Sequence, residues 1–191
     1  RRLVRIHGGS IAGEGKLQFA SPFFRITENG TNAVITIRRT GGTTGEIAVR
    51  LESFPGTAGR ADYIRVSTNL VFPEAEAFRT VLIPVLNDAE VETDETVNLQ
   101  LSNVTGGDVL GIQPNATLVI ESDDSQIEFS SAAYSVTENF VTGSASVTLR
   151  RLGFTGTTHT VAFFTEGGTA TPNSDYASVS NTVTFAPGPS T

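Results

Sequence analysis

Acidic side chains are concentrated in two short stretches of the sequence. Residues 86–95 carry five carboxylates in ten positions, and residues 121–124 carry three in four. Two further acids, Glu28 and Asp62, stand alone at the ends of alternating apolar runs. Hard divalent cations, Ca²⁺ above all, take about six to eight oxygen ligands from flexible carboxylates and carbonyls. The pattern therefore favours an oxygen-only cation site, provided that the fold brings the separate stretches together.

The composition excludes several other chemistries. The chain has no cysteine and only two histidines, so a thiolate zinc site is impossible. The net charge of −7 disfavours nucleic acid as a partner, because phosphate binding needs clustered lysine and arginine. No apolar stretch approaches the ~20 residues of a membrane span, which argues against direct membrane insertion. Neither histidine neighbours a persuasive nucleophile and no Gly-x-Ser-x-Gly elbow occurs, so we predict that the chain is not an enzyme.

The sequence contains an internal repeat. The segment FASPFFRITENG begins at Phe19 and its echo FSSAAYSVTENF begins at Phe129, a spacing of 129 − 19 = 110 residues. Further matches follow in the same order, and this collinearity indicates a duplication. The matched landmarks are Arg38-Arg39 with Arg150-Arg151, Gly56-Thr57-Ala58 with Gly168-Thr169-Ala170, Asp62-Tyr63 with Asp175-Tyr176, and Val71-Phe72-Pro73 with Thr184-Phe185-Ala186.

Between these landmarks apolar and polar residues alternate, as they do in β-strands. Ala33, Ile35 and Ile37, for example, fall on one face of a strand. Glycine-rich turns separate such runs, and no helical window is longer than a turn or two. This predicts an all-β fold, an immunoglobulin-like antiparallel β-sandwich in tandem copies. Strands are expected at residues 33–38, 47–51, 70–72, 78–86, 96–101, 117–120, 144–150 and 160–164.

The repeat divides the chain into three parts. Residues 17–124 are expected to form one complete sandwich. Residues 127–191 are expected to form a second copy, truncated at its C-terminal end. Residues 1–16 are expected to be a linker or N-terminal extension, in which residues 3–6 could add a short strand. The two arginine pairs of the repeat are expected to point outward into solvent.

The order of these motifs resembles that of the Calx-beta domain family. The resemblance is carried by Thr-Glu-Asn at 27–29, Arg-Arg-x-Gly at 38–41, Asp62-Tyr63, the acidic loop at 87–95, and Asp123-Asp124. The family includes calcium-binding domains of sodium/calcium exchangers, an integrin module and many bacterial surface repeats. The resemblance implies a seven-stranded antiparallel sandwich that holds calcium in the loops at one end.

The resemblance also implies a set of calcium ligands. Asn87 and Ser122 depart from the family pattern, which has Asp there, so fewer ions or weaker binding are expected. In the second copy only Glu138 and Asp175 match the set, and Asp175 is expected to cap a turn. The implied ligands are Glu28, Asp62, Asn87, Asp88, Glu92, Glu95, Ser122, Asp123 and Asp124.

The sequence leaves three functions open, in order of preference. The first is a calcium-binding module of a larger surface or secreted protein, in which Ca²⁺ orders the loops and stiffens the junction between repeats. The second is a structural adhesion or spacer module, whose acidic loop is an ordinary solvated turn. The third is an intracellular calcium-sensing domain. The expected partners are calcium ions and neighbouring repeats, with other surface proteins or glycans as further candidates, and the expected location is extracellular or on the cell surface.

Overall fold

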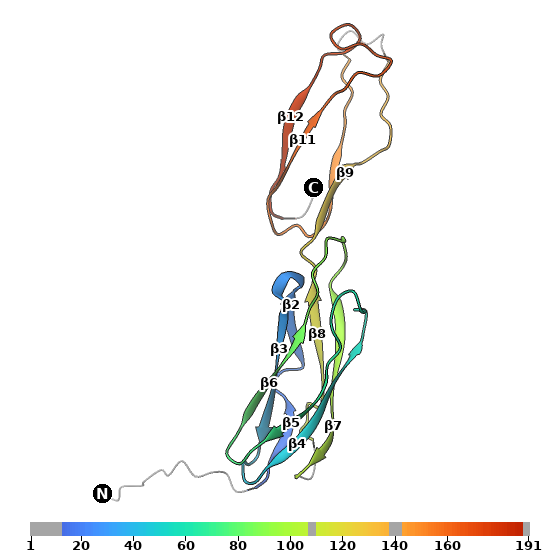
Figure 1. The fold of residues 1–191 in the computed structure, drawn as a ribbon. Helices are drawn as coiled ribbons and strands as arrows, with labels where there is room; N and C mark the ends of the chain where they lie inside the picture. The colour runs from blue at the N-terminus through green and yellow to red at the C-terminus, as the bar shows by residue number, and fades with distance from the viewer. Residues whose placement is uncertain (1–12, 107–109, 138–142, 189–191) are drawn as a thin grey trace, which may run out of the picture. The chain divides into compact units, whose positions relative to one another are not determined.

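The computed structural model describes residues 13–106, 110–137 and 143–188, and within these residues it is all β apart from one short 3₁₀ turn. Strands β1 to β8 form a first compact unit, and β9 to β12 belong to a second (Figure 1). No helix among the described residues is long and apolar enough to cross a membrane. The strand expected at residues 3–6 lies outside the described residues.

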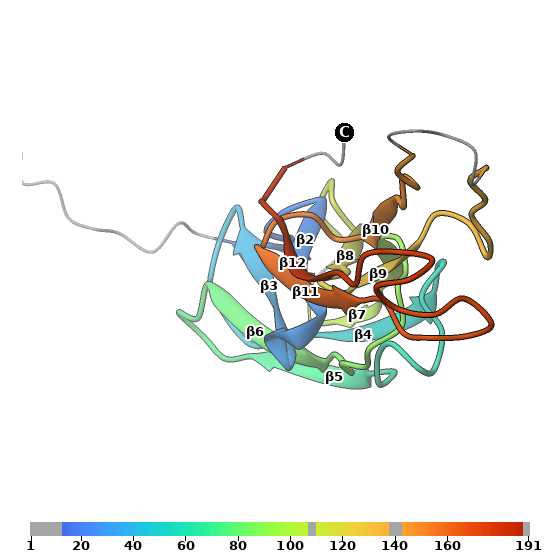
Figure 2. The same cartoon turned by 90° about the horizontal axis from the view of Figure 1, so that it is seen from above.

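The first unit is a sandwich of two sheets, which confirms the predicted fold class. One sheet has the order β1-β3-β6 and the other the order β2-β8-β7-β4-β5. Seen from above, β3 and β6 lie to the left of β4 and β7 (Figure 2). The strands are β1 (Lys16–Phe19), β2 (Phe23–Thr27), β3 (Asn32–Thr40), β4 (Ile47–Pro55), β5 (Ser67–Phe72), β6 (Phe78–Pro84), β7 (Glu95–Thr105) and β8 (Asn115–Glu121).

The first strand of the sandwich changes sheets part-way along, so eight strands are present where the family resemblance implies seven. β1 pairs antiparallel with β3, whereas β2 pairs parallel with β8 in the other sheet. The switch falls at Pro22, which has no amide hydrogen to donate to a ladder. The carbonyl of Pro22 accepts the amide of Thr117 at 2.9 Å and so starts the new pairing. This crossing brings the end of β2 beside the end of β8.

The core lies between the two sheets and consists of the inward face of each strand. Ala33, Ile35 and Ile37 are all buried, as the alternation predicts. Each large apolar side chain buried in this way contributes roughly 1.5–3 kcal/mol to stability. The largest fully buried side chains include Phe19, Phe72, Leu51, Ile83, Leu99, Leu101 and Leu118.

The second unit repeats part of the first. Its strands are β9 (Ser125–Phe129), β10 (Leu149–Gly153), β11 (His159–Phe164) and β12 (Ser180–Phe185). They form two antiparallel pairs, β9 with β10 and β11 with β12. In the repeat alignment these strands match β1, the end of β3, β4 and β5 in turn.

The prediction of a strand at residues 144–150 is wrong for the first five of them, because β10 begins at Leu149. In the first unit the corresponding half of β3 pairs with β6. In the second unit only the half that faces β9 is a strand, with Leu149 opposite Phe129. A strand without a neighbour leaves its backbone donors and acceptors unpaired, so apolar alternation alone does not produce one.

Arg39 contradicts the expectation that the arginine pairs point outward, because only 4% of its surface is exposed. Its Nε donates to the carbonyl of Glu14 at 2.6 Å, and Nη1 donates to that of Pro73 at 3.2 Å. Nη2 donates to the carbonyls of Thr44 and Gly45 at 2.7 and 2.9 Å. One guanidinium thus joins three separate segments at the end of the sandwich opposite the acidic loops.

Arg151 occupies the matching position in the second unit and is buried in the same way, with 5% of its surface exposed. It donates from Nη1 to the carbonyl of Thr157 at 2.8 Å and from Nη2 to that of Phe154. In contrast, Arg150 is exposed and forms an ion pair with Glu128. The second arginine of each pair therefore orders the loop that follows it, whereas the first is half-buried at Arg38 and exposed at Arg150.

We predict that Arg39→Gln destabilises the protein by about 3 kcal/mol. The shorter amide cannot reach the carbonyls that the guanidinium satisfies, and charged hydrogen bonds of this kind are worth roughly 1.5–3 kcal/mol each. Urea unfolding of the variant measures the loss, with Arg60→Gln at an exposed position as the matched control. A loss below about 0.5 kcal/mol, as for ordinary surface substitutions, would contradict the structural role of Arg39.

Candidate metal centre

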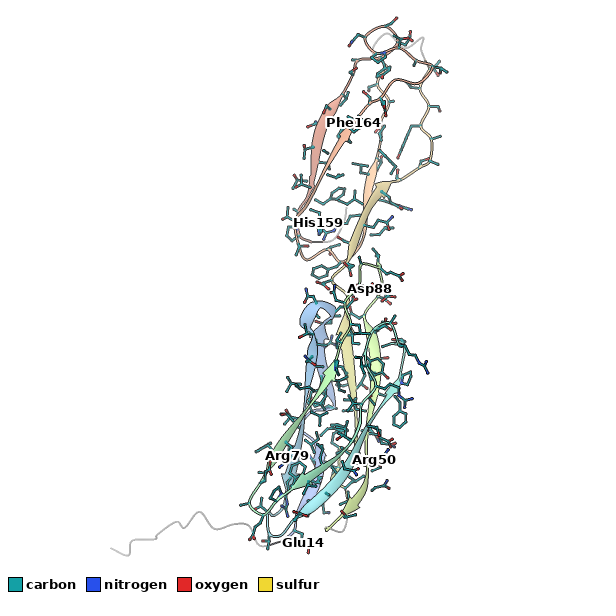
Figure 3. The ribbon with its side chains drawn as sticks, viewed as in Figure 1. Glu14, Arg50, Arg79, Asp88, His159 and Phe164 are labelled. Atoms are coloured by element: carbon teal, nitrogen blue, oxygen red, sulfur yellow. The ribbon has the colours of Figure 1, made fainter. Side chains whose placement is uncertain are left out.

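The pairing of the strands brings the acidic segments to one end of the first sandwich. β2 runs parallel to β8 with Thr27 opposite Glu121, so the residues after both strands leave the sheet side by side. β7 is antiparallel to β8 and begins at this end, with Glu95 opposite Ile120. β4 ends opposite the beginning of β7. Figure 3 labels Asp88 at this end and Glu14 at the other.

The first group of acids is built around Glu28. This residue begins the 3₁₀ turn Glu28–Gly30 and is buried, with 5% of its surface exposed. Its Oε1 accepts the backbone amide of Asp88 at 2.9 Å, which ties the turn to the loop after β6. Glu28, Asp123 and Asp124 each offer a carboxylate oxygen, and these oxygens lie within 4.8 Å of one another.

The second group consists of Asp62, Glu92 and Glu95, whose carboxylate oxygens also lie within 4.8 Å of one another. Asp62 is held through both its side chain and its main chain. Its Oδ2 accepts the amide of Gly59 at 2.5 Å, and its carbonyl accepts the amide of Leu86 at 2.9 Å.

The neighbour of Asp62 anchors this turn in the core. Tyr63 is buried and forms an isolated antiparallel bridge with Val85, the residue after β6. Desolvation raises the pKa of the Tyr63 hydroxyl, so this side chain adds no negative charge at neutral pH. The bridge fixes the loop after β4 against the loop after β6, and so sets the position of Asp62.

Buried oxygen atoms after β8 provide a test of whether a cation fits. Ser122 Oγ and Asp124 Oδ2 are buried, and neither has a hydrogen-bond partner within the described part of the chain. Leaving a buried oxygen unsatisfied costs roughly 1–3 kcal/mol, and more when it is charged. Two oxygens on one Ca²⁺ stand at most about 5 Å apart, given metal–oxygen distances near 2.5 Å. The oxygen spacing within each group and the two orphaned atoms therefore fit a hard divalent cation.

Two of the remaining predicted ligands, Asp88 and Asn87, make hydrogen bonds through the loop after β6. Asp88 belongs to neither acidic group and contributes its backbone amide to Glu28. Asn87 is exposed, and its side-chain amide donates to the carbonyl of Asp88 at 3.1 Å. The amide of Asp88 is a contact that sequence reasoning missed, since no pattern of residue types reports a backbone hydrogen bond.

In the second unit, Asp175 Oδ2 accepts the amide of Thr171 at 2.7 Å, which is the turn-capping arrangement expected for it. Its counterpart in the first copy, Asp62, makes a similar contact to a backbone amide and also joins an acidic group. Glu138 lies outside the described residues.

Comparisons with known proteins agree with this architecture. The adhesion G-protein coupled receptor V1 of Danio rerio is 34% identical over 113 residues, which are 58% of this chain and 2% of the receptor. The sodium/calcium exchanger Calx of Drosophila melanogaster is 27% identical over 173 residues, which are 89% of this chain and 18% of the exchanger. The chain thus spans only a small fraction of either relative.

Two solved structures share the fold. The apo form of the Calx CBD1 domain aligns with a TM-score of 0.54 and 26% identity, covering 57% of this chain and 97% of that domain. The calcium-binding domain CBD12 of CALX1.1 aligns with a TM-score of 0.60 and 24% identity. The alignment covers 90% of this chain and 71% of the CBD12 chain. The Calx-beta domain model matches residues 11–125 and again residues 121–191. With almost the whole sequence covered by these two matches, the chain belongs to the Calx-beta family, as its motifs predict.

Proposed function

We propose that this chain is a calcium-binding module whose acidic end holds Ca²⁺ in the two carboxylate groups. The observation that carries the proposal is the approach of three carboxylate oxygens in each group to within 4.8 Å. Glu28, Asp123 and Asp124 would hold one ion, with the buried hydroxyl of Ser122 close by in sequence. Asp62, Glu92 and Glu95 would hold another.

Bound calcium would supply positive charge to a crowded anionic end. Three ionised carboxylates that converge without a cation repel one another, and this repulsion raises the free energy of the compact arrangement. The protein's part is to hold the oxygens in place: the amide of Asp88 fixes Glu28, and the turn at Gly59 fixes Asp62. One solved structure with the same fold is described as the calcium-binding domain CBD12 of CALX1.1, which supports the same chemistry here. As a Calx-beta module the chain is not an enzyme.

We further propose that calcium stiffens the junction between the two repeats. Asp124 directly precedes β9, the first strand of the second unit. Its carbonyl accepts the amide of Phe154, in the loop that follows β10, at 2.7 Å. An ion that fixes the carboxylate of Asp124 would also restrain the main chain at the start of β9.

The setting we propose is a larger surface or secreted protein with neighbouring repeats, because one relative is an adhesion receptor and the chain spans little of it. A structural spacer without bound metal is the second candidate. It is favoured by Asn87 and Ser122, which provide oxygens without negative charge. An intracellular regulatory role is favoured only by the exchanger relative. Calcium-dependent stability separates the first candidate from the second.

We predict that calcium raises the melting temperature of the chelator-treated protein by roughly 10 °C at 100 times its Kd. Saturation at that level stabilises the folded state by about 2.7 kcal/mol, and a domain of this size shifts by several degrees per kcal/mol. The double substitution Glu92→Gln with Glu95→Gln should remove at least half of the rise. Glu74→Gln, at an exposed turn between β5 and β6, is the control and should keep all of it. A parent protein that melts at the same temperature with and without calcium would favour the spacer.

If each carboxylate group holds one calcium ion, substitutions in one group should remove one ion and leave the other bound. Asp123→Asn with Asp124→Asn keeps the volume of the side chains and removes two negative charges from the first group only. We expect the number of calcium ions bound per chain, measured by equilibrium dialysis, to fall by one. The double glutamate substitution should remove the other ion. Loss of all binding in either variant would show one shared site in place of two.

If calcium stiffens the junction between the repeats, backbone motion there should decrease when calcium binds. In ¹⁵N relaxation, the order parameters of residues 123–126 should rise when calcium is added, because the main chain beside the ligands becomes fixed. Gly168, in the distant β11–β12 loop, provides an internal control that should not change. Equal order parameters in calcium and in chelator would refute stiffening while leaving calcium binding intact.

A further inference from the structure

A groove crosses the outer face of the five-stranded sheet in the first unit, apart from both acidic groups. It has a volume of about 540 Å³ and is lined by residues of β2, β8, β7 and β4. Two phenylalanines, Phe23 and Phe54, stand among side chains that carry amides and hydroxyls. The aromatic, amide and hydroxyl side chains that a ligand in the groove would contact are Phe23, Phe54, Asn98, Gln100, Asn115 and Thr117.

The strand register arranges these residues in rows. Phe23 lies opposite Thr117, Thr117 opposite Asn98, and Asn98 opposite Phe54, so one row crosses four strands. Neighbouring strands are about 4.8 Å apart, which separates the two phenylalanines by roughly 14 Å. Asn115 and Gln100 form the next row. The result is a polar floor with an aromatic side chain at each end.

The two phenylalanines differ in how their rings are presented. Phe23 is on the edge strand β2 and has 61% of its surface exposed, an unusual position for so large an apolar side chain. Phe54 is partly buried, and the guanidinium of Arg65 lies 5.5 Å from its ring centroid. An exposed ring beside a hollow of this size offers an apolar surface to a ligand.

The side chains that line the groove are uncharged although the chain carries a net charge of −7, and the guanidinium of Arg65 lies beside Phe54 at one end. No charged side chain is among the described residues that line it. Two of its amides are oriented by the backbone, since Asn98 Nδ2 donates to the carbonyl of Pro55 at 3.2 Å and Gln113 Nε2 to that of Asn115. An amide held through one donor directs its oxygen and its second N–H, so it can both accept and donate a hydrogen bond.

We propose that this groove binds a neutral, unbranched saccharide of about three rings. Sugar hydroxyls donate and accept hydrogen bonds as amides and threonine hydroxyls do, and the C–H faces of sugar rings pack against aromatic rings. An anionic ligand would need arginine or lysine in the floor. A peptide that added a strand would bind the backbone edge of a sheet, not an amide-bearing face. This proposal does not depend on calcium binding, because none of the acidic groups lines the groove.

The test is a calorimetric titration of the full chain with four neutral hexasaccharides: cellohexaose, laminarihexaose, xylohexaose and maltohexaose. Hexagalacturonate serves as the charged control, and a hexa-alanine peptide as the strand-forming control. Saturable binding of at least one neutral sugar is expected, with neither control bound. No saturable heat from any of the four at millimolar concentration would overturn the proposal, as would preferential binding of either control.

Two variants locate the binding surface. Phe23→Ala and, separately, Asn98→Ala should each weaken binding at least tenfold. Phe78→Ala is the matched control, because Phe78 lies on β6 in the other sheet and is exposed to 62%, close to the 61% of Phe23. Substitutions at such exposed positions leave the core intact, and unchanged melting temperatures verify this. Full affinity in Phe23→Ala, or an equal loss in Phe78→Ala, would place the sugar elsewhere and refute the assignment.

Discussion

Carboxylates that converge at one end of the first sandwich repel one another, and this repulsion raises the free energy of the compact loop arrangement there. Within each of two groups, three carboxylate oxygens lie within 4.8 Å of one another. In addition, Asp124 Oδ2 is buried without a hydrogen-bond partner in the part of the chain that the structure describes. Such an arrangement costs free energy unless positive charge is supplied. The buried Arg39 does not supply it there, because its guanidinium is committed to backbone carbonyls at the opposite end. A divalent cation held by these carboxylates would supply it.

Strand pairing creates this crowding. The crossing of the first strand at Pro22 sets β2 beside β8, which places Glu28 next to the residues that follow Glu121. The bridge between Tyr63 and Val85 then fixes the other two loops. Pairing also decides what the second unit forms, since its strands occur only where partners are present in the described residues. The same backbone requirement therefore explains the acidic end of one copy and the shorter strands of the other.

Much of the fold follows from local alternation, and the errors arise where a distant partner decides. Ala33, Ile35 and Ile37 share a buried face, and the same alternation places Arg39 inward. We expected it in solvent because arginine is usually exposed, an expectation that four backbone carbonyls override. The strand expected at 144–150 forms only over its last two residues, because no strand among the described residues pairs with the first five. For the metal centre, the family pattern selects the acids, whereas the role of the Asp88 amide is visible only in three dimensions.

Calcium binding at the acidic end can be measured by calorimetric titration of the chelator-stripped chain, with magnesium as the control. Saturable binding of calcium is expected, with magnesium binding far more weakly, because the carboxylate groups offer many oxygens while Mg²⁺ keeps its own water. Asn87 and Ser122, which bring no charge, should limit the affinity. If millimolar calcium gives no saturable heat, the calcium site is refuted and the acidic end is a solvated surface on a structural spacer.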